Sequence, residues 1–267
     1  MNSKKEASIG IFDSGFGGLT VMKALKEVLP NEHMIYFGDT ARVPYGNKSP
    51  ETILKYTIEN ASFLIEKGIK LLVIACHTAC SVALPCMGNM FNVPIIGIQA
   101  SGIEEVAKTS KSGRIGILGT RATIGSGVYQ TQITRLLPKA EIIALPCPLF
   151  VPLVEEGYID HVLTEMVVKE YLLPLSASDV DTLLLGCTHY PLLKDSIKKE
   201  IGPLVNVVDP AIKCAQHVRL ALETAGLLNT NKDTPEYHFY VTDDADKFRS
   251  LGRIFLNYPI ENIILKD

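Results

Sequence analysis

The stretch LLVIACHTA (residues 71–79) contains an apolar run of strand length that ends at Cys76 and precedes a helix-forming segment. A second stretch, LLLGCTHYPLL (183–193), repeats this pattern around Cys187. Apolar runs without polar alternation are typical of parallel strands that are buried on both faces. In such sheets ligands bind at the turn from strand to helix. The two cysteines are therefore predicted to lie at equivalent ligand-binding turns.

The same alternation of strand and helix patterns extends outward from these two stretches. Strands are predicted over residues 8–13, 34–39, 71–76, 93–98, 113–120, 140–145, 181–187, 236–242 and 261–265. Helical segments are predicted over residues 18–29, 51–68, 81–90, 125–138, 211–228 and 244–256. This order predicts an α/β fold built from doubly wound, mainly parallel sheets.

An internal similarity suggests that the fold is a repeat of two halves. The segment from Gly10 to Cys76 resembles the segment from Gly116 to Cys187, because each leads from a glycine-bearing strand to a cysteine at the carboxyl end of another strand. We expect two pseudosymmetric lobes that face each other across one active site, with a carboxyl-terminal tail that returns to the first lobe. The predicted lobes are residues 1–99 with 209–267 for lobe 1 and residues 100–208 for lobe 2.

The composition limits the classes of protein that fit the chain. It has 267 residues, 47% of them hydrophobic, a net charge of −3 and a pI near 6.1. Such a chain can bury a sizeable core, and it has no basic field for direct binding of nucleic acid. No stretch approaches the ~20 apolar residues of a membrane span, so we expect no membrane contact and a cytoplasmic location. In that reducing compartment the six cysteines should be free thiols.

Two cysteines on opposite sides of one site suit a particular proton transfer. Inverting an amino acid at Cα requires one group that removes a proton from one face and another that delivers a proton to the other face. A free thiol has a pKa near ~8.5, and the amides at a helix N-terminus and a nearby polar partner are expected to lower it. A single buried cysteine is more often a small apolar residue. The paired placement of Cys76 and Cys187 nevertheless favours a catalytic role for both.

Three other segments are predicted to contribute polar groups to the same site. DSGFGG (13–18) follows a strand and opens a helix, although an ordinary helix N-cap is an equal alternative for this segment. PYG (44–46) could place Tyr45 and its neighbouring amides at a carboxylate, and GTRAT (119–123) ends another strand. The positions concerned are Asp13, Ser14, Pro44, Tyr45, Gly46, Thr120 and Thr123.

Metal binding is the main chemical alternative for these residues. Cys76, His77 and Cys80 could share one side of a helical turn, and His189 follows shortly after Cys187. Zinc sites usually show paired CxxC or HExxH spacings, and the sequence has neither. We therefore predict no metal site.

From about residue 8 to residue 228 the chain resembles the glutamate racemases of bacterial cell-wall synthesis. The motifs that carry the resemblance are IGIFDSGFGGLTV (9–21), YFGDTARVPYG (36–46), VIACHTA (73–79), GILGT (116–120), CPLFVPLVEEG (147–157) and LLLGCTHYPLL (183–193). The resemblance implies a two-lobed fold and interconversion of L- and D-glutamate without pyridoxal phosphate, metal or any other cofactor. It also implies that the D-glutamate serves peptidoglycan synthesis.

The resemblance further implies a role for individual residues. Cys76 would remove the α proton of the D isomer with help from Asp13. Cys187 would remove that of the L isomer with help from His189, and Glu155 is a weaker candidate near the site. The residues predicted to bind substrate, from the resemblance and the motifs above, are Asp13, Ser14, Pro44, Tyr45, Gly46, His77, Thr78, Thr120, Thr123, Glu155, Thr188 and His189.

Position 77 departs from the family pattern, which reads Cys-Asn-Thr where this chain has Cys76-His77-Thr78. An asparagine amide both donates and accepts hydrogen bonds, whereas a neutral imidazole does each at a different nitrogen. We hypothesise that His77 retains substrate binding but alters KM, pH dependence or substrate choice. If protonated, His77 would also lower the pKa of Cys76.

Two alternative functions remain open at the level of the sequence. One is an aspartate or other amino-acid racemase of the same superfamily, but those enzymes resemble Cys-Thr-Glu at the second motif, and Cys187-Thr188-His189 favours glutamate. The other is a binding protein, because some relatives are reported to restrain DNA gyrase as a second role. A purely non-catalytic module would not require both thiols. We also expect a homodimer, whose geometry the sequence does not specify.

Overall fold

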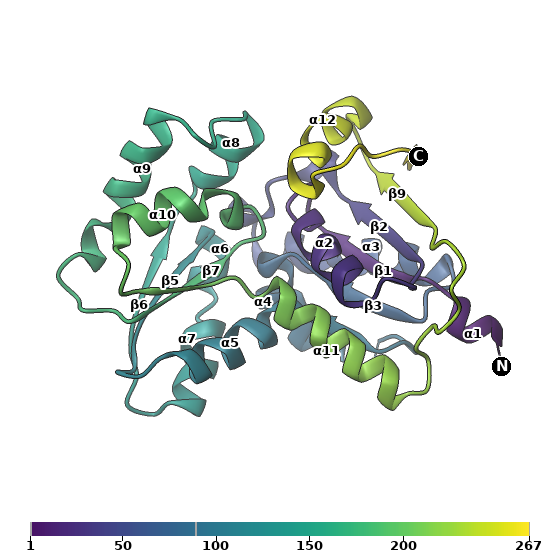
Figure 1. The fold of residues 1–267 in the computed structure, drawn as a ribbon, viewed down its shortest axis with the longest axis horizontal. Helices are drawn as coiled ribbons and strands as arrows, with labels where there is room; N and C mark the ends of the chain where they lie inside the picture. Colours follow the sequence, from purple (N-terminus) through teal and green to yellow (C-terminus); the bar gives the residue numbers. More distant parts are fainter. Residues whose placement is uncertain (1, 89, 267) are drawn as a thin grey trace.

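The chain forms two parallel β-sheets with helices packed on their faces (Figure 1). The structure is a computed structural model that describes residues 2–88 and 90–266. The strands of the first sheet are β1 (Ile9–Asp13), β2 (Met34–Gly38), β3 (Leu71–Ile74), β4 (Ile95–Gly97), β9 (Tyr237–Val241) and β10 (Ile263–Leu265). Those of the second sheet are β5 (Arg114–Gly119), β6 (Glu141–Pro146), β7 (Thr182–Gly186) and β8 (Asn206–Val208).

Helices occupy most of the remaining described chain. The α-helices are α1 (Asn2–Glu6), α2 (Leu19–Val28), α3 (Pro50–Glu66), α4 (His77–Met87), α5 (Ile98–Thr109), α6 (Arg121–Gly125), α7 (Val128–Leu136), α8 (Phe150–Glu155), α9 (Val162–Leu172), α10 (Lys194–Ile201), α11 (Ala211–Thr224) and α12 (Ala245–Leu256). Short 3₁₀ helices are η1 (Thr40–Arg42), η2 (Tyr45–Asn47), η3 (Leu173–Leu175) and η4 (Tyr190–Leu193). No helix in these described ranges is long and apolar enough to cross a membrane.

The two sheets share one strand order. The first runs β10-β9-β2-β1-β3-β4 and the second β6-β5-β7-β8, and all pairings are parallel. The four strands β2-β1-β3-β4 therefore correspond to β6-β5-β7-β8. This order is doubly wound, because each sheet grows outward from its first strand in both directions. The predicted α/β class and the two-lobed pseudosymmetry are confirmed.

Strands β1 and β3 of the first sheet are buried along their full length. Apolar residues fill them because α2 and α11 cover one face of the sheet while α3 and α4 cover the other (Figure 1). The larger hydrophobic core includes residues of both sheets, and a smaller cluster surrounds β5 between α5 and α7. The two halves of the molecule are thus packed against each other.

The chain passes between the sheets twice, through α5 on the way to β5 and from β8 into α11 (Figure 1). Strands β9 and β10, from the carboxyl-terminal tail, extend the first sheet beside β2. The exact lobe boundaries at residues 99/100 and 208/209 stay a prediction. Residues 1, 89 and 267, which fall within the predicted first lobe, lie outside the described residues.

Three local differences from the predicted elements bear on the site. Helix α4 begins at His77 rather than at residue 81, so that Cys76 is its N-cap, and Asn89 of the predicted helix is not described. The predicted helix over 125–138 is divided into α6 and α7 by Gly127, whose φ is 67°. Cys187 precedes the 3₁₀ helix η4 rather than an α-helix. Of the three, the break between α6 and α7 has a clear cause, because Gly127 adopts a left-handed conformation that ends a helix.

Candidate active site

Cys76 lies two residues beyond the end of β3 and caps the N-terminus of α4. Its sulfur donates to Ser14 Oγ at 3.3 Å and accepts from the Ala79 amide at 3.5 Å, and the residue is only 5% exposed. Burial, together with the carboxylate of Asp13, raises the pKa of the Cys76 thiol to about 12, because the two hydrogen bonds offset these effects only in part. The helix amide of Ala79 and the hydroxyl of Ser14 lower this pKa as predicted, but the net shift is upward because desolvation outweighs both.

Cys187 lies at the equivalent position after β7 and has a different set of partners. Its sulfur is 3.9 Å from His189 Nδ1, and His189 Nε2 is 3.0 Å from Glu155 Oε1. Burial lowers the pKa of His189, but the hydrogen bonds with Cys187 and Glu155 more than compensate and raise it to about 10. His189 is therefore an imidazolium at neutral pH, and both of its nitrogens can donate.

The two cysteines belong to one site. Cys76 bonds to Ser14, and the adjacent Asp13 accepts a hydrogen bond from Thr188, the residue after Cys187, so the turns that hold the two thiols lie beside each other. Both residues are almost completely buried, as are Asp13 and Thr188. Each thiol therefore comes from the carboxyl end of a strand in a different sheet, as the paired motifs predict.

Asp13 ends β1 and connects the two halves of the site. Its Oδ2 accepts from the Gly15 amide at 2.9 Å, and Thr188 Oγ1 donates to its Oδ1 at 3.4 Å. Burial raises the pKa of Asp13, while the charge of His189 and these hydrogen bonds lower it in part. The carboxyl group thus lies between Cys76 on one side and the Cys187 turn on the other.

The DSGFGG turn approaches the Cys187 turn so closely that Gly17 has no room for a side chain. A Cβ atom at Gly17 would lie 2.2 Å from Thr188 Oγ1 and 2.5 Å from His189 Nδ1. Thr20 Oγ1, from the start of α2, also donates to the carbonyl of Thr188 at 3.3 Å. The glycine is required here by this contact between two segments far apart in the sequence.

Three threonine hydroxyls meet where α4 packs against α6. Thr78 Oγ1 lies 2.9 Å from Thr120 Oγ1 and 3.1 Å from Thr123 Oγ1, and the last two are 2.9 Å apart. Thr78 comes from α4, whereas Thr120 caps α6. Each hydroxyl can donate one hydrogen bond, so the group can bind the oxygens of a carboxylate in place of its internal bonds.

The segment 44–46 reaches the threonines through its backbone and not through the Tyr45 side chain. The Tyr45 hydroxyl donates to the buried carboxylate of Asp39 and accepts from Asn60 Nδ2 at 3.0 Å. A Cβ atom at Gly46 would lie 2.5 Å from Thr120 Cβ, so the backbone here is in contact with Thr120. Only the main chain of Pro44–Gly46 is therefore placed to meet a ligand at the threonines.

His77 is buried and points toward the second half of the molecule. Its Nδ1 is hydrogen-bonded to the hydroxyl of Tyr129 on α7. Burial lowers the pKa of His77 to about 3, so the imidazole is neutral near pH 7. A protonated His77 is thus not available to lower the pKa of Cys76, and that part of the hypothesis is wrong.

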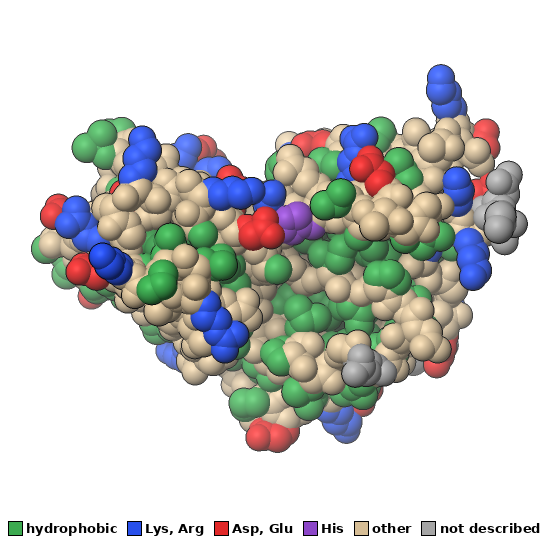
Figure 2. Space-filling model, turned by 90° about the horizontal axis from the view of Figure 1, so that it is seen from below, with side chains coloured by type: hydrophobic (Ala, Val, Ile, Leu, Met, Phe, Trp, Pro, Cys, Tyr) green, Lys and Arg blue, Asp and Glu red, His purple; other side chains and the backbone are tan. Residues whose placement is uncertain are grey.

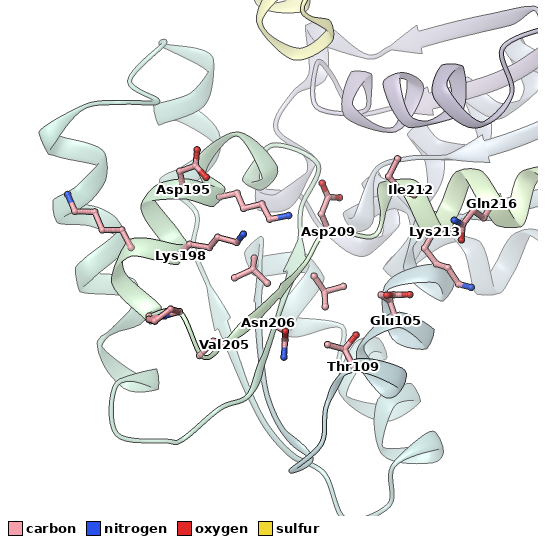
Figure 3. A pocket seen from close by; sticks show the side chains of 16 residues that line it. Glu105, Thr109, Asp195, Lys198, Val205, Asn206, Asp209, Ile212, Lys213 and Gln216 are labelled. Atoms are coloured by element: carbon pink, nitrogen blue, oxygen red, sulfur yellow. The ribbon is translucent and has the colours of Figure 1, made fainter.

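The surface of the molecule has a hollow and a groove, and the two thiols do not line the groove. Figure 2 shows one face that is hollowed between the two halves, with hydrophobic side chains gathered near its middle. A groove of about 1080 Å³ lies between β8, α5, α10 and α11, and Lys198, Asn206 and Asp209 line it (Figure 3). None of the predicted site residues lines this groove. Among the described residues, no three His, Cys, Asp or Glu side chains are arranged to bind a metal ion.

Several residues that support the site were not among the predicted site residues. Asp39, Asn60 and Thr242 hold the segment before Tyr45, and the ring of Phe255 meets that of His189 edge to face at 5.6 Å. Asp39 belongs to the YFGDTARVPYG motif, which is the one sequence signal among them. The remaining residues lie on elements that come near the site only through the order of strands in the first sheet.

Comparison with known proteins places this geometry in a family. Residues 9–218 match the family model described as Asp/Glu/hydantoin racemase. The chain is 48% identical to a glutamate racemase from Persephonella marina and 46% identical to one from Geobacter metallireducens, and both alignments cover at least 95% of each chain. The crystal structure of a glutamate racemase from Francisella tularensis in complex with D-glutamate superimposes with a TM-score of 0.93 at 40% identity, covering 98% of both chains.

Proposed function

Because this chain belongs to the Asp/Glu/hydantoin racemase family, we propose that it is an amino-acid racemase that interconverts L- and D-glutamate, with Cys76 and Cys187 as the two proton-transferring groups. The observation that carries the proposal is the placement of two buried thiols at corresponding strand ends of the two sheets. Full-length similarity to glutamate racemases supports glutamate as the substrate.

The different partners of the two thiols suit proton removal from the L isomer. The His189 imidazolium lies beside Cys187, where its Nδ1 can donate a hydrogen bond to the sulfur that accepts the α proton. Cys76 carries its proton at neutral pH because burial raises its pKa to about 12. The Cα–H bond breaks as an S–H bond forms at Cys187. The S–H bond of Cys76 then breaks as its proton is delivered to the opposite face of Cα, which gives the D isomer.

The reverse reaction uses the same groups in the opposite protonation states. Cys76, as a thiolate, removes the α proton of the D isomer, and Cys187 delivers a proton to the other face. Asp13 lies beside Cys76 and His189 beside Cys187, so each thiol has an acid–base group through which its proton can be exchanged. Glu155 orients His189 through the hydrogen bond at Nε2.

Polar groups around the thiols are suited to bind the charged groups of glutamate. In this proposal the hydroxyls of Thr78, Thr120 and Thr123 and the backbone of 44–46 bind carboxylate oxygens. Ser14 and Thr188 complete the site beside Asp13. These hydroxyls bond to one another or to site residues here, so bound substrate replaces hydrogen bonds between protein groups.

We also propose the setting in which the activity operates. The D-glutamate would serve peptidoglycan synthesis in the cytoplasm, where the six unpaired cysteines would remain reduced. The proposed assembly is a homodimer. Aspartate is the alternative substrate, and the His189 that follows Cys187-Thr188 favours glutamate over it.

The proposal is tested by hydrogen exchange at Cα. Purified protein is incubated in D2O with L- and with D-glutamate, without added cofactor, and deuterium incorporation and optical rotation are followed. The variants are Cys76→Ala and Cys187→Ala, with Cys86→Ala, an exposed cysteine on α4, as the matched control.

We expect the wild type and Cys86→Ala to exchange and racemise both isomers, and both active-site variants to lose racemisation. Exchange without inversion should persist only for the isomer whose proton faces the remaining thiol. Racemisation that survives either active-site substitution would refute the two-thiol mechanism. Exchange with aspartate and not with glutamate would identify the alternative substrate.

A further inference from the structure

Thr242, at the end of β9, binds the loop that leads to the proposed substrate-binding segment 44–46. Its Oγ1 donates to Asp39 Oδ1 at 3.0 Å and accepts from the Ala41 amide at 2.9 Å. The neighbouring residue continues the contact, since the Asp243 amide donates to Thr40 Oγ1 at 2.8 Å. Thr242 lies beyond residues 9–218, the part of the chain that the family model matches.

Asp39 is the centre of this contact. Its carboxylate is completely buried and accepts hydrogen bonds from Thr242, from Arg42 Nε at 2.9 Å, from Asn60 Nδ2 at 3.1 Å and from the Tyr45 hydroxyl. A buried carboxylate is tolerated only when donors surround it. Each donor therefore keeps the carboxylate, and the loop segments attached to it, in one arrangement.

The loop from Asp39 to Asn47 is held at both ends. At its start Asp39 is attached to β9 through Thr242, and near its end Gly46 contacts Thr120 of the second half. Between these points the Tyr45 side chain returns to Asp39, which sets the orientation of the 44–46 backbone. Loss of the Thr242 hydroxyl would thus alter the position of the Asp39 carboxylate. Through Asp39 it would alter the backbone of residues 44–46, which lies beside the threonine hydroxyls.

We propose that Thr242 is a positioning residue for substrate binding, which acts through Asp39 to orient the backbone of residues 44–46 toward a substrate carboxylate. This inference rests on the proposed function, because it assigns a carboxylate of the amino-acid substrate to that backbone. Thr242 makes none of the hydrogen bonds of the two thiols. Its loss should therefore weaken substrate binding and leave the proton transfers nearly unchanged.

The test compares Thr242→Val, which removes the hydroxyl at nearly constant volume, with Thr242→Ser, which retains it. Thr234→Val is the matched control, because Thr234 is exposed and lies in the segment before β9. For each variant KM and kcat are measured with glutamate, and hydrogen–deuterium exchange is measured at the amides of residues 39–47 without substrate. If Thr242→Val does not fold, Thr242→Ala takes its place.

We expect Thr242→Val to raise KM by about 10-fold, the effect of losing one hydrogen bond to a charged group. Its kcat should stay within about twofold of the wild-type value. Amide exchange over residues 39–47 should become faster. Thr242→Ser should restore both properties, and Thr234→Val should change neither.

An unchanged KM in Thr242→Val, or a fall in kcat at constant KM, would overturn the inference. If the wild type does not act on glutamate, only the proposed function is refuted, because amide exchange still tests the role of Thr242. If amides 39–47 of Thr242→Val then exchanged as slowly as those of the wild type, the positioning role of Thr242 would be refuted.

Discussion

The two thiols of the site differ in their chemical surroundings although they occupy equivalent positions. Cys76 has a hydroxyl and a carboxylate as neighbours, whereas Cys187 has an imidazolium that a second carboxylate orients. Pseudosymmetry of the backbone thus does not extend to the charges. Since the two proton transfers act on opposite faces of one carbon, the acid–base properties of each thiol can be set separately by its own partner.

His189 makes the stability of the protein depend on pH. Its pKa of about 10 in the folded state exceeds the ~6.5 of an unfolded histidine, so protonation stabilises the fold. This stabilisation is complete below about pH 6.5 and is lost as the pH rises toward 10. We expect His189→Gln to lower the midpoint of thermal unfolding most at pH 6, with a difference from wild type that shrinks as the pH rises.

Thermal unfolding of both proteins between pH 6 and pH 10 measures this difference. His238→Gln is the control, because His238 is partly exposed on β9 and its ion pair with Glu236 lies at the surface. A difference between His189→Gln and wild type that stays constant over this range would show that His189 is not held in its protonated form.

At the scale of elements, the site is assembled by turns that follow parallel strands. The turn after β1 and the turn after β7 contact each other at Gly17, and the turn after β5 meets α4 at the threonine hydroxyls. Parallel strands of one sheet end at the same edge, so the turns that follow them lie close together. The separation between the turns is then set by the size of the side chains where they touch.

We predict that Gly17→Ala lowers kcat/KM by roughly 100-fold, because an added methyl group would displace Thr188 and His189, and a shift of about 1 Å at a catalytic group has an effect of this size. A Cβ atom at this position would lie 2.2 Å from Thr188 Oγ1. Steady-state kinetics with both isomers give the result, and Gly125→Ala is the control because its Cβ would meet no atom within 4 Å. Equal activities of Gly17→Ala and Gly125→Ala would contradict the prediction.

At the scale of the whole molecule, hydrogen bonds join the two halves beside the site. The bond between His77 on α4 and Tyr129 on α7 is one of them, and Tyr129 packs into the smaller core around β5. An asparagine side chain at position 77 is shorter than an imidazole, so it would leave the buried Tyr129 hydroxyl without this partner. The departure from the family pattern at position 77 therefore changes the connection between the halves.

We expect His77→Asn to lower the free energy of unfolding by about 1–3 kcal/mol, the cost of an unsatisfied buried polar group. The pH–rate profile between pH 6 and 9 should not change, because the pKa of His77 is about 3. The loss of stability should shrink below pH 6.5, where wild-type His77 itself favours unfolding by taking up a proton.

Denaturant unfolding of His77→Asn, Tyr129→Phe and the double variant measures the coupling between the two residues. Additive effects of the two substitutions would show that the hydrogen bond contributes nothing. A shifted pH–rate profile of His77→Asn would instead restore a titrating role for His77 near the thiols.

The sequence by itself determined the α/β class, the repeat and the two cysteine turns. Each of these depends on local pattern: apolar runs form buried strands, and the residues that follow them lie at the ligand-binding edge. Asp13, Cys76 and Cys187 were predictable because they directly follow such runs. Helix starts were less predictable, since α4 begins at His77 only because Cys76 caps it.

Only the tertiary structure decided which groups surround each thiol and with what charge. Burial raises the pKa of Cys76 and keeps His77 neutral, and neither effect can be read from neighbouring residues. Tyr45 turns away from the thiols because Asp39 and Asn60 converge on its hydroxyl, and Thr242 joins them through the order of the first sheet. Desolvation and contacts between distant segments depend on packing in three dimensions, whereas strand and turn patterns depend on the chain alone.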